Sequence, residues 1–348
     1  MAGAVSAAVS SVFPSLAWTA SAPPSGSTID PMSLVDPELR APLRSLLKDA
    51  GGFVVSADNL EQIRKPQVNS SPPLQSDYEE RLIPGAAKAA DVRVLVINAA
   101  ADGRQRPAIL HIHGGGFVSG RAVDAIPALQ RIAREHECTV VSVDYRLAPE
   151  TRFPGSLEDN YAALKWLHRS AHSLGVDPSR IAIMGESAGG GHAAMLGIAA
   201  RDRGEVPIAF QLLIYPMLDD RTGSVRHAPP YIGAYIWVPA SNRFGWSSLL
   251  GNPAGSHSVP SGAVPARVAN LAGLPPSFIG VGSVDLFVDE DLDYARRLIA
   301  SGVPTEICVV PGAYHGFDVI APHAACSKAF RATWNAALAR AFSTSASA

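Results

Sequence analysis

The chain has 348 residues, of which 47% are hydrophobic and 17% charged, and its formal net charge is −2. This length suits one large α/β domain with a sizeable core, or two smaller domains. The balanced charge argues against nucleic acid or an anionic membrane as a partner, and no apolar run reaches the roughly 20 residues that a membrane span needs.

The first 29 residues are rich in Ala, Ser and Pro and carry no charged side chain. A secretory signal peptide needs a basic start and an unbroken apolar stretch, but no Lys or Arg follows Met1, and Pro14 interrupts the stretch. We therefore predict an N-terminal extension over residues 1–29 and a cytoplasmic protein, with secretion as the alternative. Three scattered cysteines also favour free thiols in a reducing compartment.

Short helical patterns over residues 30–70 predict an N-terminal cap that is too small to fold alone. From residue 71 to 348, apolar strand-like runs alternate with amphipathic helices, which indicates a mostly parallel sheet buried on both faces. The predicted strands are Tyr78–Ile83, Val92–Ile97, Ala108–His113, Val140–Tyr145, Ile181–Gly185, Ala209–Tyr215, Phe278–Gly282 and Glu306–Val310. The predicted helices are Val123–His136, Ser156–Ala171, Gly189–Arg201, Asp289–Ser301 and Ala324–Phe342.

The alternation breaks down between about residues 217 and 265. This insertion is rich in Gly, Pro and Ser, and it carries several aromatic residues. Because it lies between two strands, we expect it above the carboxyl edge of the sheet, where α/β proteins bind ligands. We predict a lid. The alternative is an aromatic surface that packs only on itself.

A serine motif provides the main functional signal. Gly185-Glu186-Ser187-Ala188-Gly189 follows an apolar run and precedes a run of small residues. This pattern predicts a strand, a tight turn and a helix, with Ser187 at the apex. Small residues permit such a turn, which lifts the serine oxygen above the sheet. The start of the helix also offers free N–H groups to an oxyanion, so we interpret Ser187 as a nucleophile.

A nucleophilic serine needs a base to remove its proton and an acid to orient that base. In doubly wound hydrolases these residues follow in the order Ser, acid, His. Asp285 ends one predicted strand and His315 follows the next, so both lie at the same sheet edge as Ser187. We predict a triad of Ser187, Asp285 and His315. Asp289 is the alternative acid, although its position favours helix capping.

The third predicted strand ends in His113-Gly114-Gly115-Gly116. Glycines let the backbone approach a substrate closely, so we predict an oxyanion hole formed by the N–H groups of Gly114, Gly115 and Ala188. Aromatic residues near these motifs are candidates for substrate binding: Phe117, Tyr215, Tyr231, Trp237, Phe287 and Phe317.

Two other interpretations of these residues are weaker. His111 and His113 would point to one strand face as zinc ligands do, but no third ligand follows at a suitable spacing, so we expect no metal. Gly189-x-Gly191-x-x-Ala194 loosely matches a dinucleotide fingerprint, with Asp219 further on, but its first glycine falls after the turn. We therefore expect no cofactor.

Together these motifs resemble the hormone-sensitive-lipase-like α/β-hydrolases. The resemblance covers roughly residues 78–340, and it rests on the glycine motif, Tyr145-Arg146-Leu147-Ala148-Pro149-Glu150, the serine motif, Asp285 in its Gly-x-x-Asp context and His315-Gly316-Phe317. It implies an eight-stranded sheet whose second strand is antiparallel, a helical cap, and hydrolysis of short-acyl esters.

The resemblance also allows a homodimer through the last strand and helix. One departure is Glu186, because the family usually has Asp before the nucleophile, and the longer carboxylate can reposition a local hydrogen bond. Two alternatives stay open. The same triad could hydrolyse a lactone, carbamate or amide, or the cleft could only bind a small molecule, as in plant hormone receptors of this family that lack the catalytic His. The presence of His315 argues against a receptor.

Overall fold

The computed structural model describes residues 29–50, 54–65, 77–86, 89–100 and 102–343. The predicted N-terminal extension lies outside the described residues except for Ile29, and the predicted division into extension, cap and catalytic domain stays a prediction. Over the described ranges, each helix is too short or too polar to cross a bilayer.

One sheet of eight strands, in the order β1-β2-β4-β3-β5-β6-β7-β8, forms the centre of the molecule. Strand β2 is antiparallel to both of its neighbours, and β3 to β8 pair in parallel. This confirms the predicted α/β-hydrolase fold, including its antiparallel second strand. The strands are β1 (Glu79–Ile83), β2 (Val92–Ile97), β3 (Arg106–Ile112), β4 (Thr139–Asp144), β5 (Val176–Glu186), β6 (Phe210–Ile214), β7 (Ser277–Gly282) and β8 (Thr305–Val310).

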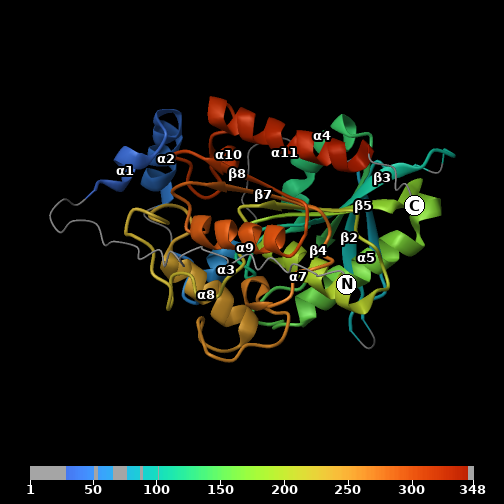
Figure 1. Ribbon diagram of the computed structural model, residues 1–348, viewed down its shortest axis with the longest axis horizontal. Coiled ribbons are helices and arrows are strands. Elements are labelled where there is room, and N and C mark those ends of the chain that lie inside the picture. The colour runs from blue at the N-terminus through green and yellow to red at the C-terminus, as the bar shows by residue number, and fades with distance from the viewer. Residues whose placement is uncertain (1–28, 51–53, 66–76, 87–88, 101, 344–348) are drawn as a thin grey trace, which may run out of the picture.

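Helices on both faces explain why the central strands are mostly apolar. Figure 1 shows α4 and α11 over one face of the sheet and α5, α7 and α9 over the other. Strands β6 and β7 are buried along their whole length, whereas the edge strand β1 is mostly exposed. The longer helices are α4 (Ile126–Glu135), α5 (Gly155–Arg169), α7 (Ala188–Arg203), α9 (Val288–Ala300) and α11 (Ala325–Ser343), and the short ones are η1 (Ala122–Ala125), α6 (Ala171–Leu174), η2 (Pro265–Arg267) and α10 (Phe317–Ile320).

The predicted insertion contains a helix that the sequence pattern did not indicate, α8 (Pro239–Leu250). Its buried residues include the polar Ser241 and Asn242 as well as Trp246, so it shows no clean apolar stripe. Gly245 faces the glycine loop after β3, where an added Cβ would lie 2.5 Å from the Gly116 carbonyl oxygen. Tertiary packing, and not periodicity, therefore stabilises this helix.

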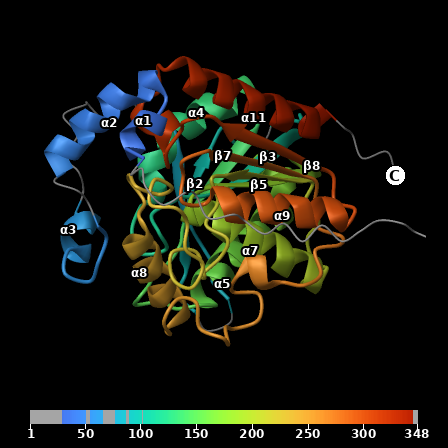
Figure 2. The same cartoon turned by 60° about the vertical axis from the view of Figure 1, so that its left-hand side comes forward.

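Three N-terminal helices, α1 (Pro31–Leu34), α2 (Pro37–Ala50) and α3 (Leu60–Arg64), lie along one end of the sheet (Figure 2). Leu39 and Leu43 of α2 are completely buried. The Asp36 N–H donates to the Gly312 carbonyl at 3.0 Å, and the Tyr314 hydroxyl donates to the Leu39 carbonyl at 3.4 Å. The start of α2 is thus tied to the loop that follows β8.

Candidate active site

Ser187 occupies a strained turn between β5 and α7. Its φ of 57° and ψ of −123° are unusual for a residue with a side chain. The neighbouring glycines are required, because a Cβ on Gly185 would lie 2.3 Å from the Gly189 carbonyl carbon, and one on Gly189 would lie 2.0 Å from the Ile112 carbonyl oxygen. The Ser187 N–H donates to the Ile214 carbonyl at 2.9 Å. The sharp turn is thereby hydrogen-bonded to β6 and packed against β3.

Ser187, His315 and Asp285 form a continuous hydrogen-bonded chain. The His315 Nε2 lies 2.9 Å from the Ser187 Oγ, and its Nδ1 lies 2.8 Å from the Asp285 Oδ2. Asp285 is completely buried, and its other oxygen accepts from the Phe287 N–H at 3.0 Å. The alternative acid, Asp289, is exposed in the first turn of α9 and pairs with Arg226. The structure therefore places Asp285, and not Asp289, against the histidine.

Two aromatic rings contact the His315 imidazole. The rings of Tyr215 and Phe287 meet it edge-on, at centroid distances of 4.9 and 5.1 Å. The Tyr215 hydroxyl donates to the Asp318 Oδ1 at 3.1 Å, and burial raises the pKa of the Asp318 carboxyl. Asp318 was not predicted as a site residue. It lies three residues after His315, at the start of a helix too short to give a periodic signal.

The glycine loop after β3 lies against the serine. An added Cβ on Gly114 would be 3.4 Å from the Ser187 Cβ. Gly115 has a φ of +121°, a conformation that L residues rarely adopt, and its carbonyl accepts from Ser119 N–H and Oγ, each at 2.9 Å. Ala188 is the first residue of α7, where a backbone N–H has no acceptor within the helix. The three predicted oxyanion donors thus belong to segments adjoining Ser187.

The predicted substrate-binding aromatics occupy different settings. Trp237 packs on the glycine loop, since a Cβ on Gly116 would lie 2.1 Å from the indole Cη2, and its Nε1 donates to Asn242. Phe117 is buried among His192 and Trp246, and Phe317 is buried against Phe330. Tyr231 is half-buried. Tyr215, Phe287 and Trp237 are therefore the members of this set that contact the His315 ring or the glycine loop.

Glu186, which stands where the family usually has Asp, forms a hydrogen bond with a buried histidine. Its Oε2 lies 3.0 Å from the His111 Nε2, and the His111 Nδ1 lies 2.8 Å from the Ser142 Oγ. His113 instead bonds the Gly114 carbonyl and stacks on Tyr145.

Within the described ranges, no group of three or more His, Cys, Asp and Glu side chains is placed to hold a metal ion. The carboxylate of Asp219, from the dinucleotide interpretation, is paired with Arg221 and Arg226.

Two buried histidines behind the glycine loop have depressed pKa values. Burial lowers the pKa of His192 to about 3 and that of His113 to about 4, because a charged imidazole loses its hydration there. Among the residues that the structure describes, neither nitrogen of His192 has a hydrogen-bond partner. These rings are therefore neutral packing elements over the working pH range.

We expect acid to destabilise the fold partly through His192. The unfolded side chain binds a proton near pH 6.5, but the folded one does so only near pH 3, so stability is lost as the pH falls below about 6.5. At pH 5 this loss is about 2 kcal/mol. His192→Leu removes the titrating ring, so urea unfolding should show a smaller loss between about pH 7.5 and 5 in the variant. An equal loss in both proteins would contradict this.

The comparisons with known proteins agree with this geometry. A family model described as alpha/beta hydrolase fold matches residues 109–319. Esterase LipI of Mycobacterium tuberculosis is 34% identical over 301 residues, covering 84% of this chain and 90% of that protein. Carboxylesterase NlhH of the same species is 34% identical over 302 residues, covering 83% of this chain and 92% of that protein.

Solved structures point the same way. A bacterial heroin esterase has a TM-score of 0.74 and 34% identity, covering 89% of this chain and 99% of that one. An esterase from Pyrobaculum calidifontis has a TM-score of 0.74 and 30% identity, covering 88% of this chain and 98% of that one. The family match contains the glycine loop and all three residues of the Ser187–His315–Asp285 chain, so by sequence and by fold the protein belongs to the α/β-hydrolase family.

Proposed function

We propose that this protein is a cofactor-free serine carboxylesterase that hydrolyses short-acyl esters through an acyl-enzyme. The observation that carries the proposal is the hydrogen-bonded chain from Ser187 through His315 to Asp285, with distances of 2.9 and 2.8 Å. Two relatives that cover most of the chain are named esterase and carboxylesterase, which supports the same reaction class.

In this reaction the Ser187 Oγ attacks the ester carbonyl carbon while the His315 Nε2 takes the hydroxyl proton. Asp285 accepts a hydrogen bond from the Nδ1–H, which fixes the tautomer and stabilises the imidazolium. The N–H groups of the oxyanion hole stabilise the negative oxygen. The tetrahedral intermediate collapses, and the alcohol leaves with the proton from Nε2. Water then attacks the acyl-enzyme with His315 as base, which releases the acid and restores the serine.

A screen of p-nitrophenyl esters from acetate to palmitate, with lactones included, tests the reaction class. A fluorophosphonate probe should label the protein covalently, and Ser187→Ala should abolish labelling. The matched control is Ser173→Ala, which changes an exposed serine on α6. A protein that binds ester analogues but is neither labelled nor active would be a receptor.

The proposal includes a two-part lid, formed by the segment from about Asp30 to Arg64 and by the insertion at about 217–265. The Val55 N–H donates to the Ser241 Oγ at 2.9 Å, so the two parts are joined. The insertion also packs on the glycine loop through Trp237. A cleft roofed by these segments would favour acyl chains of about two to eight carbons, given the usual size of ligand pockets. A homodimer and a cytoplasmic location also stay proposals.

We expect deletion of residues 1–64 to cause aggregation or to lower butyrate ester turnover on the order of 10²-fold. The reason is that α2 contacts the loop that carries His315. A displacement of a catalytic group such as His315 by about 1 Å can lower turnover about 10²-fold. Loss of Leu39 and Leu43 would also expose their apolar partners. Deletion of residues 1–28 is the control, because it keeps these contacts. A 1–64 deletion that matches the full chain, or a full chain faster on palmitate than butyrate, would remove the case for the lid.

A further inference from the structure

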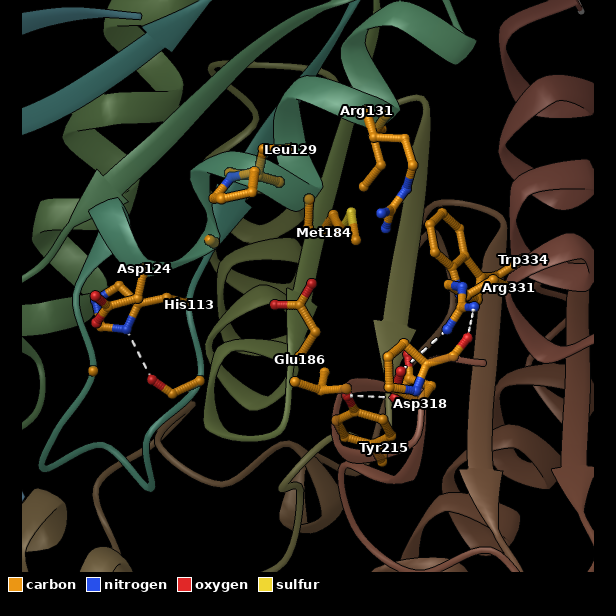
Figure 3. A pocket seen from close by; sticks show the side chains of 18 of the residues that line it. His113, Asp124, Leu129, Arg131, Met184, Glu186, Tyr215, Asp318, Arg331 and Trp334 are labelled. Carbon is orange, nitrogen blue, oxygen red and sulfur yellow. Dashed lines mark hydrogen bonds between the residues drawn. The ribbon is translucent and has the colours of Figure 1, made fainter. Parts of the chain in front are cut away.

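A cavity of about 630 Å³ lies between α4 on one side and α10 and α11 on the other (Figure 3). Its lining residues come from the sheet and from the helices and loops that cover it, and none of them belongs to residues 29–65 or to the insertion. Its size falls within the range of about 300–1,000 Å³ that is usual for small-molecule sites. It is therefore a ligand-sized space that the predicted lid does not form.

The inner end of this cavity adjoins the reacting groups. Gly114, Glu186 and Tyr215 line it. Gly114 lies against Ser187, Glu186 directly precedes that serine, and the Tyr215 ring contacts His315. Figure 3 shows the Glu186 and Tyr215 side chains at this end, with Tyr215 bonded to Asp318. Ser187 and His315 are not among the lining residues themselves, so a group bound at the serine would enter the cavity by passing Gly114, Glu186 and Tyr215.

We propose that the cavity binds the alcohol half of the ester, which leaves in the first step; this inference rests on the proposed function. His315 must give its proton to the departing oxygen, so the alcohol lies on the histidine side of the serine. Tyr215, which contacts the histidine, and the segment just after His315, Asp318 and Val319, line the cavity. The acyl half then lies toward Trp237 and the lid, which are not part of the lining.

The walls indicate the chemical class of that alcohol. Most of the cavity surface is apolar, and Leu129, Ile132, Met184 and Trp334, which contribute to it, are buried, but the acidic side chains of Glu186 and Asp318 line it as well. Charged side chains such as Arg131 and Lys328 also line it, and both of these are exposed. Apolar walls favour a bulky apolar alcohol, such as an aryl or cyclic one, because its transfer from water is favourable. We expect the kcat/KM of naphthyl esters to be higher than the chemical reactivity of the naphthol leaving group alone would give.

Two substitutions that narrow the cavity from opposite sides test this proposal. Ala128→Phe acts from α4 and Val319→Trp from α10; both positions are exposed, so the fold should tolerate the change. The matched control is Ala336→Phe, at an exposed position on α11 outside the lining. Unchanged thermal unfolding in each variant shows that the fold is intact.

Each variant is measured on 2-naphthyl and ethyl butyrate, which share an acyl group, and on p-nitrophenyl acetate and octanoate, which share an alcohol. We expect the naphthyl-to-ethyl ratio of kcat/KM to fall at least about tenfold in both narrowed variants, the scale for mismatched apolar pockets. The octanoate-to-acetate ratio should not change, and Ala336→Phe should alter neither ratio.

Pre-steady-state kinetics gives an independent readout. The alcohol has left before deacylation begins. The two narrowed variants should therefore show a slower burst of naphthol release from naphthyl butyrate, while the rate of deacylation of the butyryl-enzyme should stay unchanged. The assignment would be overturned if the octanoate-to-acetate ratio or the deacylation rate changed, or if the naphthyl-to-ethyl ratio stayed unchanged in both variants. None of these results would contradict the esterase activity itself. A wild-type protein that hydrolyses none of these esters would instead overturn the proposed function.

Discussion

Replacing Ser187 with Ala is expected to lower kcat by up to about 10⁶-fold, because the residues of a triad act as one unit. Adding His315→Ala should cost little more, since the base has no nucleophile left to activate. The fold should survive, because Ala is smaller than Ser and fits the same turn. Steady-state hydrolysis of p-nitrophenyl butyrate measures the effect, and unfolding curves check stability.

The control for this prediction is Ser173→Ala, at an exposed serine away from the site, which should keep full activity. If Ser187→Ala retained more than about a tenth of the wild-type activity, the nucleophile would have to be another group. Additive losses in the double variant would show that serine and histidine act separately, which the 2.9 Å contact between Oγ and Nε2 argues against.

Gly115→Ala is expected to lower kcat about 10²–10³-fold, the usual cost of losing one oxyanion donor. Two features of the structure predict this. The φ of +121° disfavours any side chain, and the new Cβ would lie 2.0 Å from the Ser119 carbonyl oxygen, so the loop must shift. The shift would move its N–H away from the oxyanion. The measurement is kcat and KM on p-nitrophenyl butyrate.

Gly204→Ala is the matched control for backbone strain. Gly204 also has a positive φ, +64°, but an added Cβ there would meet no atom of the described residues within 4 Å. Its replacement at the end of α7 should cost about 1 kcal/mol of stability and leave kcat unchanged. If Gly115→Ala raised KM and kept kcat intact, the glycine loop would be a substrate-binding surface, and the oxyanion donors would have to be sought elsewhere.

The lid illustrates the limit of periodicity as a signal. Residues 239–250 form a helix whose buried face includes serine, asparagine and glycine, and this composition does not look helical in isolation. The contact of Gly245 with the Gly116 carbonyl explains why a small residue is needed there. That contact joins residues 129 positions apart by number, so no local pattern could have indicated it.

The sequence by itself determined what depends on neighbours along the chain: the eight strands, the sharp turn at Ser187, and the glycines after β3, because backbone conformation and apolar alternation are local properties. The order of the motifs also favoured Asp285 over Asp289 as the acid, and the contact of Asp285 with His315 agrees with that prediction. Only the tertiary structure decided that Glu186 bonds His111. It also brought α4 and α11 together around a cavity that Glu186 and Tyr215 line. Such contacts join residues far apart in sequence, and they form only when side chains pack around the finished sheet.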